Sequence, residues 1–228
     1  MPRIGSDSEY YQHQAKYAKL VEFVTSHVRK QIFQAFMHAA KPQADAKVLD
    51  IGVTSNDRSD CNLFEALYPY PHKITAVGLE DASFLESEYP GLKYVKADAL
   101  NLPFADKSFD IAVSWAVIEH LGSRKRQLAF VQEMSRVSRA FFLTTPNRWY
   151  PIEFHTVMPF VHWLPPKSFR QILRLLKMPF YATEETLNLL DRRQLLSLLP
   201  ETVEYECMNA RLLGPVSNLV VFARDKQG

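Results

Sequence analysis

Short apolar runs typical of buried strands alternate along this chain with segments of helical periodicity. The strand-like runs are 47–52, 74–79, 92–96, 109–114, 140–144, 202–208 and 217–224. Strands that alternate with helices form βαβ units, whose right-handed crossovers place helices on both faces of one sheet. The pattern therefore predicts an α/β fold with a doubly wound, mostly parallel sheet.

The longest helical pattern covers residues 8–40, where apolar side chains recur every three or four positions until Pro42. The other segments with helical patterns are 62–68, 82–88, 124–137, 167–177 and 184–198. Asp60 or Asn62 is expected to cap the helix over 62–68, because a short polar side chain accepts hydrogen bonds from the first free amides of a helix.

Composition indicates one folded, cytoplasmic domain. The chain has 228 residues, of which 47 % are hydrophobic and 23 % charged, which excludes a disordered or fibrous chain. The net charge of +2 gives no general attraction for a polyanion, so we expect no nucleic-acid partner. No apolar stretch resembles a signal core or a membrane span. Cys61 and Cys207 match no zinc or redox spacing, and no metal site is expected.

Carboxylates follow three of the predicted strands where each strand ends, which is where ligands bind in doubly wound sheets. Asp50 precedes Gly52, and the glycine permits a tight turn and a close backbone approach to a ligand. Glu80 suits a ribose diol, because a carboxylate accepts two hydrogen bonds. Asp98 beside the small Ala99 suits an exocyclic amine on a flat ring. Taken alone, each position also fits an ordinary turn or a helix cap.

The most specific pattern of the chain is DALNLPFADKSFDIAVSWAVIEHL, which runs from Asp98 to Leu121 after VLDIG and ITAVGLE. In order and spacing, residues 46–146 resemble the class I S-adenosylmethionine-dependent methyltransferases, of the UbiE/UbiG-like small-molecule type with a methyltransferase type 11 domain. The resemblance implies a Rossmann-like sheet of seven strands, the last of them antiparallel. It also implies transfer of a methyl group from S-adenosylmethionine to a small-molecule or lipid-linked acceptor.

The same resemblance implies a domain organisation. We expect a single methyltransferase-like domain over 1–228, with an N-terminal helical extension at 1–42 and an acceptor-side insertion at 147–181.

The resemblance assigns the cofactor-binding residues from one end of the cofactor to the other. Asp50 would help to hold the methionine ammonium group, and Gly52 would let the loop pass close to the cofactor. Ser114 and Trp115, at the end of the fourth run, would border the methionine part.

At the nucleoside end, the resemblance implies that Glu80 binds the ribose hydroxyls. Asp98 would meet the adenine amine, with Ala99 and Leu100 against the ring.

The loop after the first strand departs from the family pattern, because it reads GVTSN at residues 52–56 where the family has three glycines in five residues. Asn56 tolerates a left-handed backbone and is expected to replace the last glycine. The departure also keeps open a catalytically inactive protein that retains the fold for binding or scaffolding, with weak or no cofactor binding. A nicotinamide-dependent oxidoreductase is disfavoured, because the chain has no GxGxxG motif.

The segment after the fifth strand carries the candidates for acceptor chemistry. Residues 147–166 combine many aromatic side chains with Glu153 and His155, a mixture that suits a half-apolar acceptor. Histidine is the side chain suited to remove a proton near neutral pH. His155, oriented by Glu153, is the first catalytic candidate, and His120 is the second. Each histidine alone also fits a simple packing role.

Residues 167–177 read as a basic amphipathic helix, with Phe169, Ile172, Leu173 and Leu176 opposite the basic side chains. With the preceding aromatic residues, 160–177 is a candidate for peripheral contact with the inner face of the membrane. A solvated basic face over core residues is the alternative.

Overall fold

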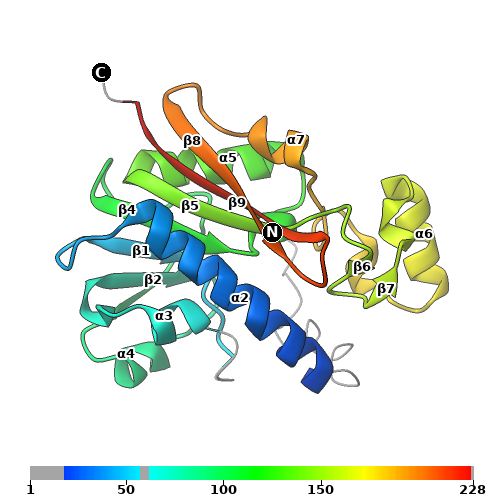
Figure 1. Cartoon of the computed structure of the whole chain (residues 1–228), viewed down its shortest axis with the longest axis horizontal. Coiled ribbons are helices and arrows are strands. Elements are labelled where there is room, and N and C mark those ends of the chain that lie inside the picture. Colours follow the sequence, from blue (N-terminus) through cyan, green and yellow to red (C-terminus); the bar gives the residue numbers. More distant parts are fainter. Residues whose placement is uncertain (1–17, 57–61, 227–228) are drawn as a thin grey trace.

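The computed structural model describes residues 18–56 and 62–226, and its centre is a twisted seven-stranded sheet (Figure 1). The strands are β1 (Val48–Ile51), β2 (Ile74–Gly78), β3 (Lys93–Lys96), β4 (Phe109–Trp115), β5 (Ser138–Pro146), β8 (Val203–Arg211) and β9 (Val216–Asp225). Their order is β3-β2-β1-β4-β5-β9-β8. Strands β1 to β5 pair in parallel, and β9 is antiparallel to both β5 and β8. The predicted fold class is confirmed, including the antiparallel last strand.

Helices and short turns connect these strands. The helices are α2 (Ala18–Ala40), α3 (Leu63–Leu67), α4 (Phe84–Glu88), α5 (Arg124–Val137), α6 (Pro166–Leu175) and α7 (Arg192–Leu196). The 3₁₀ turns are η2 (Pro71–Lys73), η3 (Ile118–His120), η4 (Val161–Trp163) and η5 (Phe180–Ala182). The part of the predicted helix 8–40 that precedes residue 18 lies outside the described residues.

The predicted helix over 184–198 is wrong, because only its last part, α7, is helical. Instead of continuing a helix, the Asn188 amide donates to the Glu119 carbonyl at 2.7 Å, and Leu190 forms a β-bridge with Asn147. The leucines that suggested a helix face are buried in two different hydrophobic clusters. Tertiary contacts have therefore replaced the helical hydrogen bonds.

Both faces of the sheet are covered, as the continuous apolar runs of its parallel strands require. On one face, α2 and α3 contribute Phe36 and Phe64, and the Phe36 ring lies 5.4 Å from the ring of Phe142 in β5. On the other face, Phe141 packs with Phe130 and other side chains of α5. Figure 1 shows α2 crossing the near face with α5 behind the sheet. Adjacent residues of β5 thus belong to opposite cores.

The segment between β5 and α7 forms a separate lobe beside the sheet (Figure 1). It contains the two-stranded hairpin of β6 (Ile152–Glu153) and β7 (Met158–Pro159). Phe169 and Leu173 of α6 pack into the small core of this lobe. Leu176 was expected on the same apolar face, but α6 ends at Leu175 and Leu176 is exposed.

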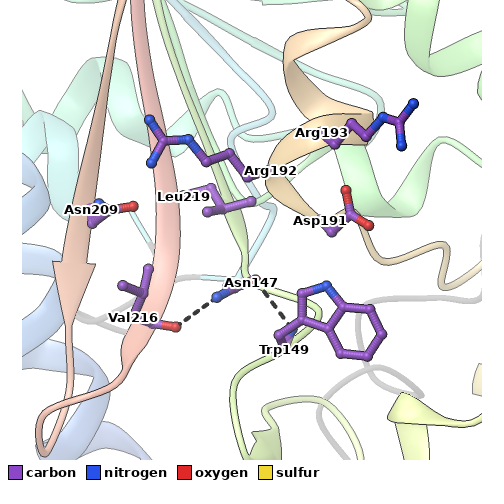
Figure 2. Close-up of a pocket in the computed structure, with 8 residues that line it drawn as sticks. All are labelled: Asn147, Trp149, Asp191, Arg192, Arg193, Asn209, Val216 and Leu219. Carbon is purple, nitrogen blue, oxygen red and sulfur yellow. Dashed lines mark hydrogen bonds between the residues drawn. The ribbon is translucent and has the colours of Figure 1, made fainter.

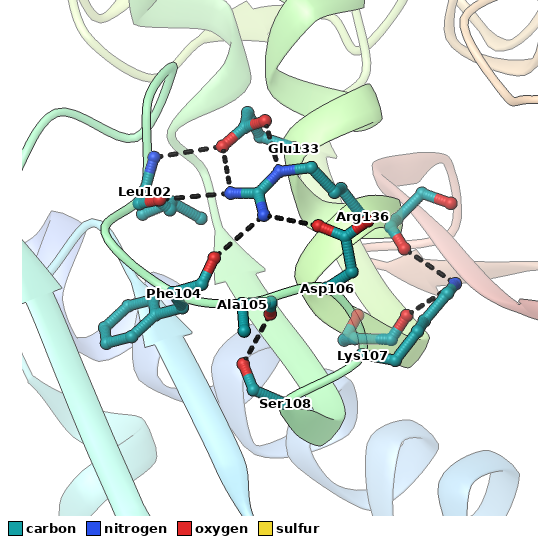
Figure 3. A network of polar contacts seen from close by, with 10 residues as sticks. Leu102, Phe104, Ala105, Asp106, Lys107, Ser108, Glu133 and Arg136 are labelled. Atoms are coloured by element: carbon teal, nitrogen blue, oxygen red, sulfur yellow. Dashed lines mark hydrogen bonds and ion pairs between the residues drawn. The ribbon is translucent and has the colours of Figure 1, made fainter.

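The loop between β3 and β4 is fastened to α5 by a polar network (Figure 3). The Arg136 guanidinium donates to the carbonyls of Leu102 and Phe104 at 3.0 and 2.8 Å, and to the Asp106 carboxylate at 2.8 Å. Glu133 binds the same guanidinium at 2.8 Å and accepts from the Leu102 amide at 3.0 Å. This network holds the loop that begins at Asp98.

Replacing Arg136 with methionine is expected to lower the free energy of unfolding by about 2 kcal/mol, because charged hydrogen bonds to the loop carbonyls are lost on a partly exposed site. Amide hydrogen exchange of the loop, at Leu102 above all, is expected to accelerate. Urea unfolding and exchange mass spectrometry measure the two effects. The exposed Arg139→Met on β5 is the matched control, and an equal loss in both variants would contradict the role of the network.

Candidate active site

The loop that follows β1 turns over the end of β2. The amides of Gly52 and Val53 donate to the Val77 carbonyl at 2.8 and 3.1 Å. Gly52 has φ of +106°, and a Cβ at this position would lie 2.2 Å from Val117 Cγ2, in the turn after β4. The backbone here adopts a conformation and a proximity that only glycine permits. The carboxyl ends of β1, β2 and β4 therefore meet around Gly52.

Asn62 stabilises this loop from the start of α3. Its side chain accepts from the Thr54 amide at 3.1 Å and donates to the Thr54 carbonyl at 3.2 Å. The predicted capping role of Asn62 is wrong, because α3 has no side-chain cap bond; Asp60 lies outside the described residues. Asn56 was expected in the left-handed region, but within 52–56 only Gly52 has positive φ. A side-chain clamp thus holds the loop where the family uses glycines.

Glu80 lies beside this loop, just beyond the end of β2. The Ser55 hydroxyl donates to Glu80 Oε2 at 2.8 Å, and the Tyr94 hydroxyl donates to the Glu80 carbonyl. The carboxylate is exposed and already accepts from a hydroxyl group.

Asp98 lies just after the end of β3, the strand that pairs with β2. Its Oδ1 accepts from the Leu100 amide at 2.9 Å, which fixes the carboxylate in a local turn. Ala99 and Leu100 are half-buried and pack against the core on the α5 side. The three residues form a half-buried shelf with one carboxylate at its edge.

Ser114 and Trp115 end β4. The Ser114 hydroxyl is buried and donates to the Ile51 carbonyl at 3.0 Å, so it links β4 to β1. The Trp115 ring contacts Phe64 edge to face at 5.7 Å, and its buried Nε1 has no hydrogen-bond partner among the described residues. An unsatisfied buried donor is uncommon, and it marks a position suited to a ligand acceptor.

Asp50 and Glu65 form a buried pair of carboxyl groups beneath the loop. Burial and the neighbouring Glu65 raise the pKa of Asp50 well above its usual value. Burial also raises the pKa of Glu65, and the hydrogen bond with Asp50 opposes this rise. The charge of Glu88 in α4 adds a smaller increase. Two buried carboxyl groups in contact hold a proton between them more tightly than exposed ones.

The pair makes stability depend on pH. Both carboxyl groups have a higher pKa in the folded protein than in the unfolded chain, so protonation stabilises the fold. This stabilisation is complete below the ordinary carboxyl pKa of about 4. It is lost as the pH rises through the raised pKa values of the folded protein. We expect Glu65→Gln to flatten this decline and to exceed the wild type at pH 8 by about 1 kcal/mol or more, one pKa unit being about 1.4 kcal/mol. Urea unfolding between pH 5 and 8 measures the difference, with the surface variant Glu201→Gln as control. An unchanged slope in Glu65→Gln would disprove the coupling.

Glu153 and His155 form a buried ion pair in the lobe, with side chains 1 % and 4 % exposed. Glu153 Oε1 lies 2.5 Å from His155 Nδ1, and Glu153 Oε2 accepts from the amide and hydroxyl of Thr156, both at 2.7 Å. Burial alone would raise the pKa of Glu153, but the His155 charge and these hydrogen bonds lower it to about 2. Burial opposes the imidazolium, yet the Glu153 carboxylate leaves the pKa of His155 raised. Glu153 thus orients His155 and favours its protonated form.

His120 and Glu119 come to the same place from the turn η3, after β4. The rings of His120 and His155 lie 4.8 Å apart and perpendicular. His120 Nδ1 donates to the Thr186 carbonyl at 2.7 Å, and the Thr145 hydroxyl at the end of β5 donates to Glu119 Oε2 at 2.9 Å. Burial raises the pKa of Glu119 to about 7 and lowers that of His120 to about 3. We call Glu119, His120, Glu153 and His155 the His–Glu cluster.

The structure therefore brings all three catalytic candidates together, and their catalytic roles stay a prediction. Sequence reasoning missed Glu119 as a member of the cluster, and it missed Thr145 as its partner. The available signal was the acid directly before His120 after the fourth strand. Because Thr145 is far from it in sequence, only the parallel pairing of β4 and β5 reveals the contact.

A cavity of about 380 Å³ opens beside the end of β5 (Figure 2). Its lining residues are Asn147, Trp149, Asp191, Arg192, Arg193, Asn209, Val216 and Leu219. The side-chain amide of Asn147 donates to the Val216 carbonyl at 2.9 Å, and this hydrogen bond holds the start of the lobe to β9. None of the predicted site residues lines this cavity.

Large apolar side chains are exposed on the lobe. Leu175 is 82 % exposed, at the end of α6. The others are Trp149, Ile152, Phe160, Trp163, Leu164 and Leu176. Among the described residues, no helix is both long and apolar enough to cross a membrane.

Comparison with known proteins matches part of the chain to one family. Residues 60–140 match the family described as "Methyltransferase domain". A probable S-adenosylmethionine-dependent methyltransferase of Mycobacterium tuberculosis is 39 % identical over 81 residues, which are 33 % of this chain and 28 % of that protein. A tRNA (carboxymethyluridine(34)-5-O)-methyltransferase of Arabidopsis thaliana is 29 % identical over 107 residues, covering 41 % of this chain and 26 % of its own length.

A solved structure shares the fold. The N-methyltransferase NodS of Bradyrhizobium japonicum, in complex with S-adenosyl-L-homocysteine, aligns with 87 % of each chain at 13 % identity and a TM-score of 0.57. The matched segments cover about a quarter of the curated relatives' length. The matches agree with the predicted resemblance over residues 60–140, and they support S-adenosylmethionine as the cofactor.

Proposed function

We propose that this chain, which carries a class I methyltransferase domain, transfers a methyl group from S-adenosylmethionine to a small-molecule or lipid-linked acceptor. The observation that carries the proposal is the placement of two polar sites at one edge of the sheet. Cofactor-type carboxylates lie near the end of β1 and just after β2 and β3, and the His–Glu cluster lies beyond β4 and β5. In doubly wound sheets this edge is where ligands bind.

The residues around Gly52 fit the cofactor. The ammonium group of the cofactor suits the buried Asp50, because the Asp50–Glu65 pair has no cation beside it in the described part of the chain. The carboxylate of the cofactor suits the buried Trp115 Nε1, which has no acceptor there. Glu80 already accepts from a hydroxyl at the position that suits the ribose. Asp98 with its shelf suits the adenine. When bound, the cofactor supplies an electrophilic methyl group.

The His–Glu cluster suits the acceptor side. For a hydroxyl acceptor, the S–CH₃ bond breaks as the O–CH₃ bond forms, and the hydroxyl proton must leave. His155 Nε2 is suited to receive it, because Glu153 holds Nδ1 and stabilises the imidazolium that results. His155 is buried, so an acceptor reaches it only when part of the lobe moves outward.

The lobe favours an acceptor with an apolar part. Trp163 and Leu175 are exposed near the basic side chains of α6, which suits a lipid-linked molecule or the membrane that carries it. The tRNA named in the description of one relative is the other candidate acceptor. A net charge of only +2 favours the lipid-linked class.

Cofactor binding is tested by calorimetry with S-adenosylmethionine and by native mass spectrometry of the purified protein. We expect binding, and we expect Asp98→Ala and Glu80→Gln each to weaken it about 10- to 100-fold, because a hydrogen bond to a charged group contributes about 1.5–3 kcal/mol. Asp110→Asn, on the exposed start of β4, is the control. Absence of binding in the wild type would support the catalytically inactive scaffold instead.

The acceptor class is tested with radiolabelled S-adenosylmethionine and two substrates, a membrane lipid extract and total tRNA. Label in the chloroform phase is the expected result. Label only in the tRNA would replace the acceptor class while leaving methyl transfer intact.

A further inference from the structure

Three ligand-type atoms converge inside the His–Glu cluster. Glu119, His120 and His155 each offer one atom, and these atoms all lie within 4.8 Å of one another. Glu119 Oε1 is buried, has no hydrogen-bond partner among the described residues, and lies 4.0 Å from His120 Nε2. A separation of 4.0 Å is too long for a hydrogen bond. A buried carboxylate oxygen without a donor needs a cation or a proton beside it.

The outer contacts of both histidines turn their Nε2 atoms toward this point. His120 Nδ1 faces the Thr186 carbonyl, which only accepts, so Nδ1 carries the hydrogen and Nε2 the lone pair. His155 Nδ1 faces the Glu153 carboxylate in the same way. Glu119 is fixed through its other oxygen by Thr145. Metal-binding histidines nearly always donate their second N–H to a carbonyl or a carboxylate, as both do here.

We propose that Glu119, His120 and His155 bind one divalent transition-metal ion of the zinc class. Zinc bonds to nitrogen and oxygen are about 2.0–2.2 Å long, which places tetrahedral donors about 3.4 Å apart. The three side chains therefore need to close by up to about 1.4 Å. Two imidazoles and one carboxylate suit zinc, cobalt, iron or manganese, whereas magnesium and calcium prefer oxygen donors alone.

Three protein ligands leave one coordination position for water or substrate. This part of the inference rests on the proposed function, because a hydroxyl acceptor bound at that position would lose its proton to water more readily. With the ion bound, His155 Nε2 is a ligand oriented by Glu153 and water takes the acceptor's proton; without the ion, the same Nε2 is the proton acceptor described above. The sequence led us to expect no metal site, because these ligands come from η3 and from the lobe and share no motif spacing.

Metal binding is measured directly, without any activity assay. Chelator-treated protein is titrated with Zn²⁺ in a calorimeter and with Co²⁺ in a visible spectrometer. We expect one equivalent of either ion to bind and Co²⁺ to give tetrahedral absorption bands. Glu119→Gln keeps a partner for Thr145 and is expected to weaken binding at least about 100-fold, as is His120→Gln. Glu153→Gln, which alters only an outer contact, is expected to weaken it about 10- to 100-fold.

His162→Gln is the matched control, because His162 is a buried histidine of the same lobe that bonds the Tyr150 carbonyl outside the cluster. It is expected to bind Zn²⁺ like the wild type. Absence of binding in the wild type, or equal binding in Glu119→Gln and His120→Gln, would overturn the metal site. If one of these results is found and metal-free protein still transfers methyl groups, the metal site is overturned and the proposed function stands. Failure to bind S-adenosylmethionine with normal Zn²⁺ binding would end the proposed function alone.

Discussion

Gly52→Ala is expected to lower the free energy of unfolding by about 2–5 kcal/mol and to weaken S-adenosylmethionine binding at least about 100-fold. An added Cβ would meet Val117 Cγ2 at 2.2 Å, and the backbone has φ of +106°. A side chain in such a conformation costs about 1–3 kcal/mol, and overpacking a close contact costs a similar amount. To relieve the overlap, the loop must move away from the turn after β4, which separates the two walls of the proposed cofactor site. Urea unfolding and calorimetry measure the two effects.

Gly214→Ala separates strain from overlap. Gly214 has almost the same φ, +103°, but none of the residues that the structure describes lies within 4 Å of an added Cβ. The Gly214→Ala variant is expected to lose only the stability that the strained backbone conformation costs, and to keep its affinity for S-adenosylmethionine. Adding Val117→Ala to Gly52→Ala should restore part of the lost affinity. If Gly52→Ala and Gly214→Ala behave alike, the close approach at Gly52 has no functional weight.

The strands could be predicted because their signal is local. The run 109–114 is apolar, bounded by turn residues and long enough for a buried strand, and the structure has β4 at Phe109–Trp115. The doubly wound arrangement follows from the right-handed crossover rule, whereas the antiparallel β9 was implied by the family resemblance alone.

The errors arise where distant residues decide local structure. Leu187 and Leu190 look like one helix face, but Leu187 packs under α6 while Leu190 joins the core on the α5 side. Asn62 looks like a helix cap, but a loop eight residues earlier takes its amide group. Propensity describes what a segment prefers alone, and burial against other elements overrides it.

The candidate site was predictable by residue type and not by geometry. Strand-end carboxylates are visible in the sequence because each follows an apolar run. The convergence of His120 with His155 depends on how the lobe folds back on η3, which no local pattern encodes. The Glu153–His155 contact was predictable, since two residues separated by one position at the start of a hairpin remain neighbours.

His155→Gln is expected to lower kcat for methyl transfer by about 10²–10⁴, the range for loss of a positioned acid–base group or its equivalent. The Kd for S-adenosylmethionine should stay unchanged, because His155 belongs to the lobe and the proposed cofactor residues lie on or just after β1, β2, β3 and β4. Steady-state kinetics with the labelled cofactor give kcat, and calorimetry gives the Kd. The split between the two is what distinguishes a role in the reaction from a general loss of folded protein.

Stability must be followed in the same variants, because removing His155 leaves the buried Glu153 carboxylate without its cation. Such a loss costs about 3–5 kcal/mol when the partner stays charged. The double variant Glu153→Gln with His155→Gln removes both charges and is expected to regain stability without regaining kcat. A double variant that recovers activity along with its fold would show that the pair only supports the lobe. Low kcat in a fully folded double variant, with normal cofactor affinity, would place His155 in the reaction itself.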